Sequence, residues 1–272
     1  MKLKELPVSL FHTLKLKCLS VKELKNSDEQ RLPIVVSLTA IPSRFSTLHI
    51  VIKSVLAQNY PPKKIVLWLH ESVKKNIPKS LAKLEGEIFE IRYTSLDCPH
   101  NKLIHTLKLY PNFPVVTCDD DLIYRQNWLQ DLYDTYLKYP DKIVAHRLRC
   151  IKTDEKGKAK PYKSWNLNDD CSSERFLPIG AEGVLYPPNV FSNIVHDENL
   201  FLKLAPKADD LWFKAVAFAE GKKAMKALKS PKQAIPILGT QRVSLKKENV
   251  GEDKNRVQWD ALAEYFQIQF KN

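Results

Sequence analysis

From residue 33 onward, short apolar runs alternate with amphipathic segments. This pattern predicts strands at 33–39, 64–69, 88–93 and 113–118, and helices at about 45–56, 79–85, 103–109 and 127–139. Strands separated by helical segments favour parallel pairing through crossover helices, so the predicted fold class is α/β with a mostly parallel open sheet flanked by helices. Ligands of such sheets bind beyond the carboxyl ends of the strands, so chemistry is expected after Thr39 and Cys118. Ser43 is expected to cap the helix that begins near Phe45.

Residues 1–30 are predicted to form a basic amphipathic leader ahead of a single domain at 31–272. The leader has apolar residues at steps of three or four, with lysines between them: Leu3, Leu6, Leu10, Leu14, Cys18 and Val21. One interpretation is a helix that lies on an anionic membrane surface. The other is a helix packed on the domain with its lysines in solvent. A second lysine-rich stretch, 222–232, could lie on the same face as the leader.

Composition narrows the function classes. Of the 272 residues only seven are glycine, and neither GxGxxG nor GxxxxGK[ST] occurs, so a bound nucleotide would need a metal or side chains at its phosphates. The five cysteines are odd in number and widely spaced, which indicates reduced thiols. With no signal-peptide pattern and no long apolar run, a cytoplasmic protein is expected.

The formal net charge of +12 raises the alternative of nucleic-acid binding. However, the lysines gather in the leader and in 222–232 with little aromatic interleaving, and the candidate cleft is acidic. No nucleic-acid partner is therefore expected.

Three adjacent carboxylates, Asp119, Asp120 and Asp121, follow the fourth predicted strand. In an extended segment alternate residues point the same way, which would place Asp119 and Asp121 on one face. Two hard oxygen ligands suit Mg²⁺ or Mn²⁺, which also take water and substrate phosphate as ligands. A solvated acidic turn that caps the next helix is the alternative, and the position at a strand end favours the metal site.

At this point the sequence resembles the GT-A fold glycosyltransferases, in particular bacterial family-2-like enzymes of capsule and lipopolysaccharide biosynthesis. The resemblance spans 33–220 and rests on the opening IVVSLTAIPSRFSTLHIVIKSVLAQNYPPKKIVLWL, on VVTCDDDLIY, and on PIGAEGVLYPPN with APKADDLWFKA. It implies a Rossmann-like GT-A domain, with a nucleotide-binding part at about 31–125 and an acceptor and catalytic part at about 126–272.

The resemblance also implies residue roles on the donor side. Asp121 would be the direct ligand of Mn²⁺ or Mg²⁺, with Asp119 near the metal or the ribose. The other donor-binding positions that it implies are Thr39, Pro42, Arg44, Lys102, Asp120, Gly180, Glu182 and Gly183. Many GT-A enzymes supply a late histidine ligand, but no histidine follows His196 here, so Glu252, Asp253 or water would have to substitute.

A second acidic pair, Asp209 and Asp210, precedes the apolar segment 211–218. Capping and the helix dipole explain one aspartate at such a position more readily than two. The resemblance implies that one of them is the general base, with Asp210 preferred and Asp209 as the alternative. Trp165 and Trp212 could stack on the acceptor sugar, although a core role is common for tryptophan.

These observations together predict an inverting glycosyltransferase. It would move a sugar from a nucleotide-diphosphate donor, most simply a UDP-sugar, to a glycan or lipid-linked glycan acceptor in surface polysaccharide synthesis. A peripheral position on the inner face of the cell membrane is expected, because the lysines favour anionic lipid. A metal-dependent phosphohydrolase is an alternative, but it would need further ligands, and the seven histidines form no HxH or HExxH group.

Overall fold

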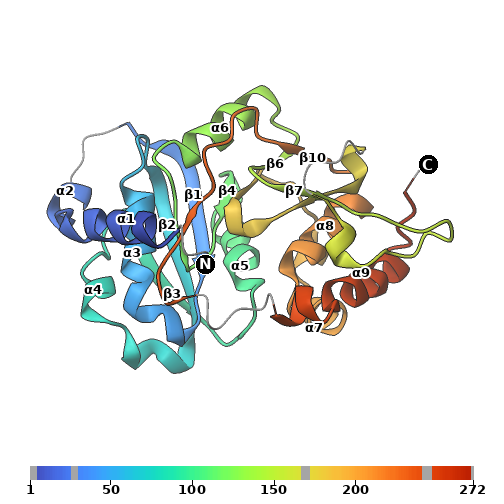
Figure 1. The fold of residues 1–272 in the computed structure, drawn as a ribbon, viewed down its shortest axis with the longest axis horizontal. Helices are drawn as coiled ribbons and strands as arrows, with labels where there is room; N and C mark the ends of the chain where they lie inside the picture. Colours follow the sequence, from blue (N-terminus) through green and yellow to red (C-terminus); the bar gives the residue numbers. More distant parts are fainter. Residues whose placement is uncertain (1–4, 26–29, 167–171, 241–246, 271–272) are drawn as a thin grey trace.

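The computed structural model describes residues 5–25, 30–166, 172–240 and 247–270. In this part of the chain the main sheet has seven strands in the order β10-β6-β9-β4-β1-β2-β3 (Figure 1). Their bounds are β1 (Leu32–Thr39), β2 (Pro62–His70), β3 (Phe89–Thr94), β4 (Val115–Thr117), β6 (Ile143–Ala145), β9 (Val184–Tyr186) and β10 (Ala224–Lys226). Strand β9 runs antiparallel to both of its neighbours, and the other pairs are parallel. The predicted α/β class with a mostly parallel sheet is confirmed.

Helices cover the sheet and extend beyond one end of it. Helices α3, α4, α5 and α6 follow β1, β2, β3 and β4 in chain order, as the apolar pattern predicted, and α7, α8 and α9 gather at the opposite end of the molecule from α1 (Figure 1). The helix bounds are α1 (Leu6–Cys18), α2 (Val21–Lys25), α3 (Phe45–Leu56), α4 (Lys79–Ala82), α5 (Asn101–Leu109), α6 (Trp128–Lys138), α7 (Glu198–Leu204), α8 (Asp209–Ala219) and α9 (Lys254–Tyr265). Two small antiparallel pairs complete the structure, β5 (Leu122–Ile123) with β11 (Ile235–Pro236), and β7 (Leu148–Cys150) with β8 (Phe176–Pro178).

Two large hydrophobic clusters form most of the core of the described residues, beside a small third one of Val35, Val66 and Trp68, and β9 belongs to both large clusters. Leu185 packs in the cluster built on β1, β2 and α3, whereas Val184 and Tyr186 pack in the cluster built on α8 and α9. Successive side chains of a strand point to opposite faces of the sheet, which explains this division. The sheet therefore joins the two halves of the molecule.

The start of α3 differs from the prediction. A 3₁₀ turn at Pro42–Arg44 precedes the helix, Arg44 holds the N-cap position, and no side chain caps the helix there. Proline favours the first position of a helical turn because its φ is already fixed near −65°. The turn therefore begins at Pro42, which leaves Ser43 inside it and exposed, and the predicted Ser43 cap is wrong.

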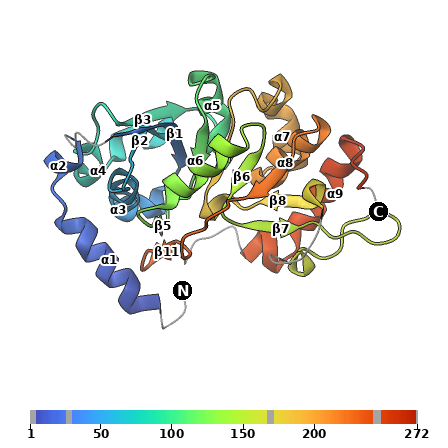
Figure 2. The same cartoon turned by 90° about the horizontal axis from the view of Figure 1, so that it is seen from above.

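The leader forms two helices within its described residues, and α1 packs against α3. Figure 2 shows α1 along one edge of the molecule, close to β5 and β11 and far from α9. Residues 1–4 and 26–29 lie outside the described residues. Among the residues that are described, no helix is long and apolar enough to cross a membrane.

One cysteine departs from the expectation of reduced thiols. Cys150 is in a disulfide bond, whereas Cys18, Cys98 and Cys118 are free. Cys171 lies outside the described residues. The prediction that all five thiols are reduced is therefore wrong at Cys150.

Candidate functional site

The aspartate triplet lies in a turn between β4 and β5, at the carboxyl end of β4. The Arg44 guanidinium pairs with Asp120 and also lies 3.2 Å from Asp121 Oδ2, while the Ile41 N–H donates to Asp120 Oδ2 over 3.2 Å. Because β4 already ends at Thr117, the triplet does not continue as an extended strand. The strand alternation on which the shared face of Asp119 and Asp121 was predicted therefore does not apply to the triplet, in which Asp120 and Asp121 share Arg44 and Asp119 pairs with Lys102.

Lys102 connects the triplet with the second acidic pair. It stands in the first turn of α5, and its Nζ lies 3.2 Å from Asp119 Oδ1 and 2.9 Å from Asp209 Oδ2. Burial alone would lower the pKa of Lys102, but Asp119, Asp209 and Asp210 raise it well above its usual value. The lysine therefore stays charged and holds the two acidic segments together.

Asp210 is held by the backbone of the loop between β8 and β9. The Gly180 N–H lies 3.2 Å from Asp210 Oδ1 and 3.1 Å from Oδ2. A Cβ at position 180 would lie 2.7 Å from Asp210 Oδ1 and 3.2 Å from Lys102 Nζ, so only glycine leaves room for this arrangement. The resemblance had implied a donor-binding role for Gly180, and in the structure the group next to its N–H is a carboxylate of the same chain.

The environment of Asp210 also changes its acidity. Burial and the nearby Asp209 carboxylate raise the pKa of Asp210 to about 7, against the opposing effects of Lys102 and the Gly180 N–H. A carboxyl group with this pKa can accept a proton near neutral pH, which is the property of a general base. The pKa of Asp209 is also raised, because the effect of burial exceeds the opposing effect of Lys102.

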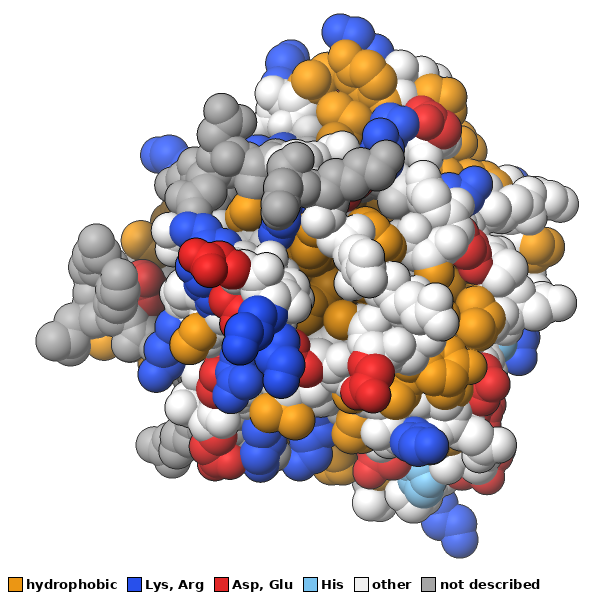
Figure 3. All heavy atoms as spheres, turned by 90° about the vertical axis from the view of Figure 1, so that its right-hand side faces the viewer, with side chains coloured by type: hydrophobic (Ala, Val, Ile, Leu, Met, Phe, Trp, Pro, Cys, Tyr) orange, Lys and Arg blue, Asp and Glu red, His pale blue; other side chains and the backbone are white. Residues whose placement is uncertain are grey.

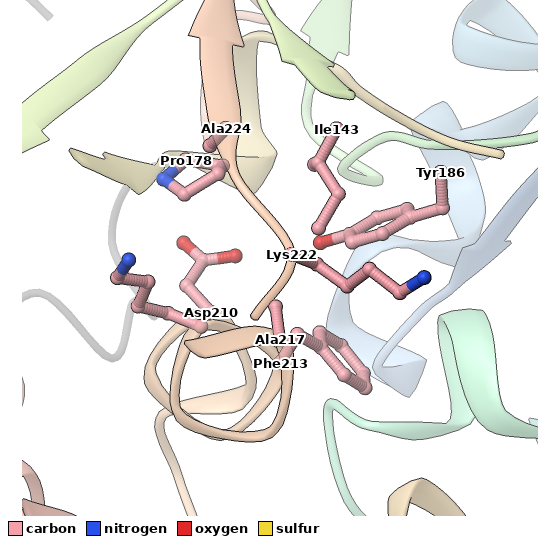
Figure 4. Close-up of a pocket in the computed structure, with 9 residues that line it drawn as sticks. Ile143, Pro178, Tyr186, Asp210, Phe213, Ala217, Lys222 and Ala224 are labelled. Atoms are coloured by element: carbon pink, nitrogen blue, oxygen red, sulfur yellow. The ribbon is translucent and has the colours of Figure 1, made fainter. Parts of the chain in front are cut away.

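A small cavity lies beside Asp210. Figure 4 shows the Asp210 carboxylate and the Tyr186 hydroxyl pointing toward its centre, with Pro178 above the carboxylate. Its volume of about 10 Å³ is enough for one water molecule and far too small for a sugar. The cavity is therefore not a donor pocket.

Tyr124 is a residue that sequence reasoning missed. Its hydroxyl accepts the Asp119 N–H over 2.8 Å and donates to the Ala181 carbonyl over 2.9 Å. It therefore fixes the backbone of the triplet against the loop that holds Asp210. No sequence signal marks Tyr124, because both of its partners are backbone groups and Ala181 is 57 positions away.

The same loop places Glu182 and Gly183. Glu182 Oε2 accepts the Ala234 N–H over 3.1 Å, and its Oε1 lies 3.6 Å from Arg147. Gly183 has a φ of +103°, and a Cβ there would lie 2.5 Å from the Trp128 indole nitrogen. Both features require glycine at 183.

The predicted metal site at Asp119 and Asp121 stays a prediction. Carboxylate oxygens are the hard ligands that Mg²⁺ and Mn²⁺ prefer. In the structure Arg44 and Lys102 pair with the triplet, and the described residues contain no group of three or more His, Cys, Asp or Glu side chains placed to hold a metal ion. Mg²⁺ can be held by one or two carboxylates together with water and substrate phosphates, so Asp119 and Asp121 are side chains of the type that such a cation takes as ligands.

Several other predicted residues lie elsewhere. Trp165 and Trp212 are fully buried, and their indole nitrogens donate to Lys160 and Val195 carbonyls, so the structure does not support an acceptor role for either. Asp253 accepts the Tyr162 N–H and pairs with Arg256, and Glu252 pairs with Lys254. None of these contacts brings Glu252 or Asp253 to the triplet.

The first strand ends beside the triplet, as expected. Thr39 Oγ1 donates to the Trp68 carbonyl over 2.9 Å, and Pro42 is exposed in the turn that leads to Arg44. Ile41 lies between these two residues in the chain, and its N–H donates to Asp120, which pairs with Arg44.

A larger, open groove lies away from this network. It has a volume of about 790 Å³ and runs between residues 153–158 and α9. Figure 3 shows the face on this side of the molecule, where lysine and arginine, acidic and hydrophobic side chains are intermixed. No predicted site residue lines the groove.

No protein-family model and no curated protein matches this chain. Many solved structures are similar to this chain, and two of them illustrate the low level of sequence identity. The 4-diphosphocytidyl-2C-methyl-D-erythritol synthase of Anaerococcus prevotii DSM 20548 is 14% identical, with a TM-score of 0.47 over 84% of this chain and 96% of that one. Residues 1–349 of S. aureus TarS are 13% identical, with a TM-score of 0.48 over 73% of this chain and 59% of that one. At these values neither structure assigns a function to this chain.

Proposed function

We propose that this protein transfers a sugar from a nucleotide-diphosphate donor to a hydroxyl group of a glycan acceptor, with inversion at the anomeric carbon. A UDP-sugar is the first donor to test. The observation that carries the proposal is the meeting of two acidic segments around Lys102 at the end of β4. These carboxylates supply, within one network, groups suited to the leaving diphosphate and to the attacking hydroxyl.

Arg44 and Lys102 act on the donor side of the site. Both are cations next to the triplet, so they offset part of its negative charge at the point where a diphosphate would enter. Tyr124 and the Ile41 N–H fix the triplet backbone and Asp120, which keeps these charges in place before the donor arrives. When bound, Mn²⁺ or Mg²⁺ held by Asp119 and Asp121 would neutralise charge on the leaving diphosphate.

Asp210 acts on the acceptor side. With its pKa near 7 it removes the proton of the acceptor hydroxyl at a carboxylate oxygen, and the Gly180 N–H keeps the carboxylate oriented. A positioned general base contributes roughly 10²–10⁴ in rate. One base and one displacement give inversion, which is why the proposal includes it.

The biological setting follows from the sequence resemblance. It suggests a step in capsule or lipopolysaccharide synthesis, with a glycan or lipid-linked glycan as the acceptor. The buried tryptophans that were expected at the acceptor supply no exposed stacking surface. Acceptor recognition therefore involves other residues near Asp210.

The experiment has two parts. A thermal-shift screen of nucleotide sugars, with and without Mn²⁺, identifies a donor by a rise in Tm. The variant Asp210→Asn should then keep donor affinity within about threefold and lose transfer by roughly 10²–10⁴. Asp141→Asn is the matched control, because it makes the same change at an exposed carboxylate that pairs with the neighbouring Lys142. This variant should keep the transfer activity of the original protein.

Two results would contradict the proposal. One is full transfer by Asp210→Asn. The other is sugar release at the same rate with and without acceptor, because a hydrolase and not a transferase would behave in this way.

A further inference from the structure

The outward face of α1 is apolar. Val8, Leu10, Phe11 and Leu14 expose 41%, 51%, 64% and 52% of their surface. Leu10, Leu14 and Cys18 follow one another at four-residue steps, so they form a line along one side of the helix, and all three are exposed. Large apolar side chains gathered in this way on a surface mark a site of interaction.

The inward face of α1 shows that this orientation is fixed. Ser9 is fully buried and its hydroxyl donates to the Pro236 carbonyl over 2.7 Å. Lys53 Nζ donates to the carbonyls of Leu16, Lys17 and Leu19 over 3.1, 3.2 and 2.7 Å at the end of the helix. A surface helix usually turns its apolar stripe to the core. Here Ser9 and Leu16 face inward while Phe11 faces solvent.

Lysines lie on both sides of the apolar line. Neighbouring helix positions differ by about 100° around the helix axis. Lys15 therefore lies on one side of the exposed pair Phe11 and Leu14, and Lys17 lies on the other side. Both lysines are exposed, as is Lys22 in α2. Lysine stems cover apolar surface while the ammonium groups reach outward, so this face presents a hydrophobic centre between positive edges.

This arrangement matches an anionic lipid surface more closely than the apolar groove of a partner protein. Apolar side chains can enter the boundary between headgroups and acyl chains, and lysines beside them meet anionic headgroups. The opposite, inward face of α1 connects the helix to the candidate site. Pro236, which binds Ser9, belongs to β11, and the next residue, Ile237, donates its N–H to the Asp121 carbonyl over 2.9 Å (Figure 2).

We propose that α1 docks this protein on anionic membranes, with Phe11 and Leu14 inserted at the lipid boundary and Lys15 and Lys17 on anionic headgroups. Docking in this orientation places α1 and β11 between the lipid surface and the aspartate triplet. The binding itself does not rest on the proposed transferase activity.

The test is co-sedimentation of the full chain with vesicles. Vesicles of phosphatidylcholine with about 30% phosphatidylglycerol should bind the protein, and pure phosphatidylcholine should bind it at least tenfold more weakly. The double variants Phe11→Gln with Leu14→Gln, and Lys15→Glu with Lys17→Glu, should each reduce binding to the anionic vesicles about tenfold or more. Thermal melts check that both variants remain folded, as their exposed positions allow.

Matched control variants can be made at exposed positions outside α1. Leu137→Gln removes a side chain that is 59% exposed on α6, and Lys156→Glu with Lys158→Glu makes the same charge change on an exposed loop. Both controls should bind within about twofold of the original protein.

The proposal is overturned if the original protein does not bind anionic vesicles, if it binds neutral vesicles equally well, or if the α1 variants bind as tightly as the controls. It is also overturned if the protein is a dimer in solution that Phe11→Gln with Leu14→Gln dissociates, because a second copy would then be the occupant of this face. Since no substrate is used, none of these results bears on the transferase proposal.

Discussion

Single residues at the site are constrained by charge and by space at once. Lys102 compensates carboxylates from two segments, and Gly180 lets Asp210 approach its N–H. Removal of the Lys102 charge, or addition of a methyl group at Gly180, would therefore disturb the contacts of several aspartates at once. Asp210 and Gly180 give the most direct tests.

The pKa of Asp210 predicts the pH dependence of activity. A base with a pKa of about 7 is protonated below that pH, so kcat/KM for transfer should fall about tenfold per pH unit below 7 and level off above it. The same shift affects stability. Because the folded state holds this proton more tightly than the unfolded chain, the contribution of Asp210 to stability decreases as pH rises from about 4 to 7.

A pH-rate profile and urea unfolding at several pH values measure both effects. In Asp210→Asn the free energy of unfolding should no longer show the decrease with rising pH that the Asp210 carboxyl causes. A flat rate profile between pH 5 and about 8 would exclude Asp210 as the base.

Gly180→Ala should separate the roles of space and charge. The added Cβ would lie 2.7 Å from Asp210 Oδ1, so the carboxylate must move away from the Gly180 N–H. We expect a loss of about 1–3 kcal/mol in the free energy of unfolding and a fall in kcat larger than any change in donor affinity. Gly251→Ala is the control, because nothing lies within 4 Å of a Cβ there. Equal kcat values for the two variants would contradict this role of Gly180.

At the scale of elements, periodicity predicted the regular half of the fold and missed the rest. Strands β1, β2 and β3 and helices α3 and α5 follow long, clear apolar patterns, and each lies where it was expected. Strand β9 has only three residues, and its antiparallel partner β4 is about 70 positions earlier, so no local signal specifies that pairing. The site shows the same limit, because the sequence indicated the acidic segments and Lys102 but not their pairing through space.

The attachment of α1 depends on one buried lysine, and Lys53→Met tests it. Lys53 is 6% exposed and donates to three carbonyls at the end of α1, where a cation also interacts favourably with the helix dipole. Methionine keeps most of the apolar stem but removes these donors, at a cost of about 1.5–3 kcal/mol for hydrogen bonds to a charged group.

We expect amide exchange in 6–18 to accelerate at least tenfold in Lys53→Met while the sheet stays protected, since α1 lies at its periphery. Lys108→Met, on the exposed side of α5, is the control. Unchanged exchange in α1 would show that apolar contacts such as those of Leu16 hold the helix without Lys53.

At the scale of the whole molecule, the two hydrophobic clusters should unfold together because β9 is part of both. Trp259 provides the test, since it is 1% exposed in α9 and contacts Trp165 and Phe270, far from β1 to β3. Trp259→Ala should lower the free energy of unfolding by about 3–5 kcal/mol. Because the sheet transmits the loss, amides of β2 should lose protection by the same free energy as those of α8.

Val257→Ala, on the same helix but 58% exposed, is the matched control and should change stability by less than about 0.5 kcal/mol. Hydrogen exchange measured strand by strand distinguishes the outcomes. If β1 to β3 keep their original protection in Trp259→Ala while α7 to α9 open, the two clusters are separate folding units and the shared strand does not couple them. Equal losses in both halves would show that the carboxylates after β4 and those on α8 are held in place by one cooperative structure, which is what a site built from both requires.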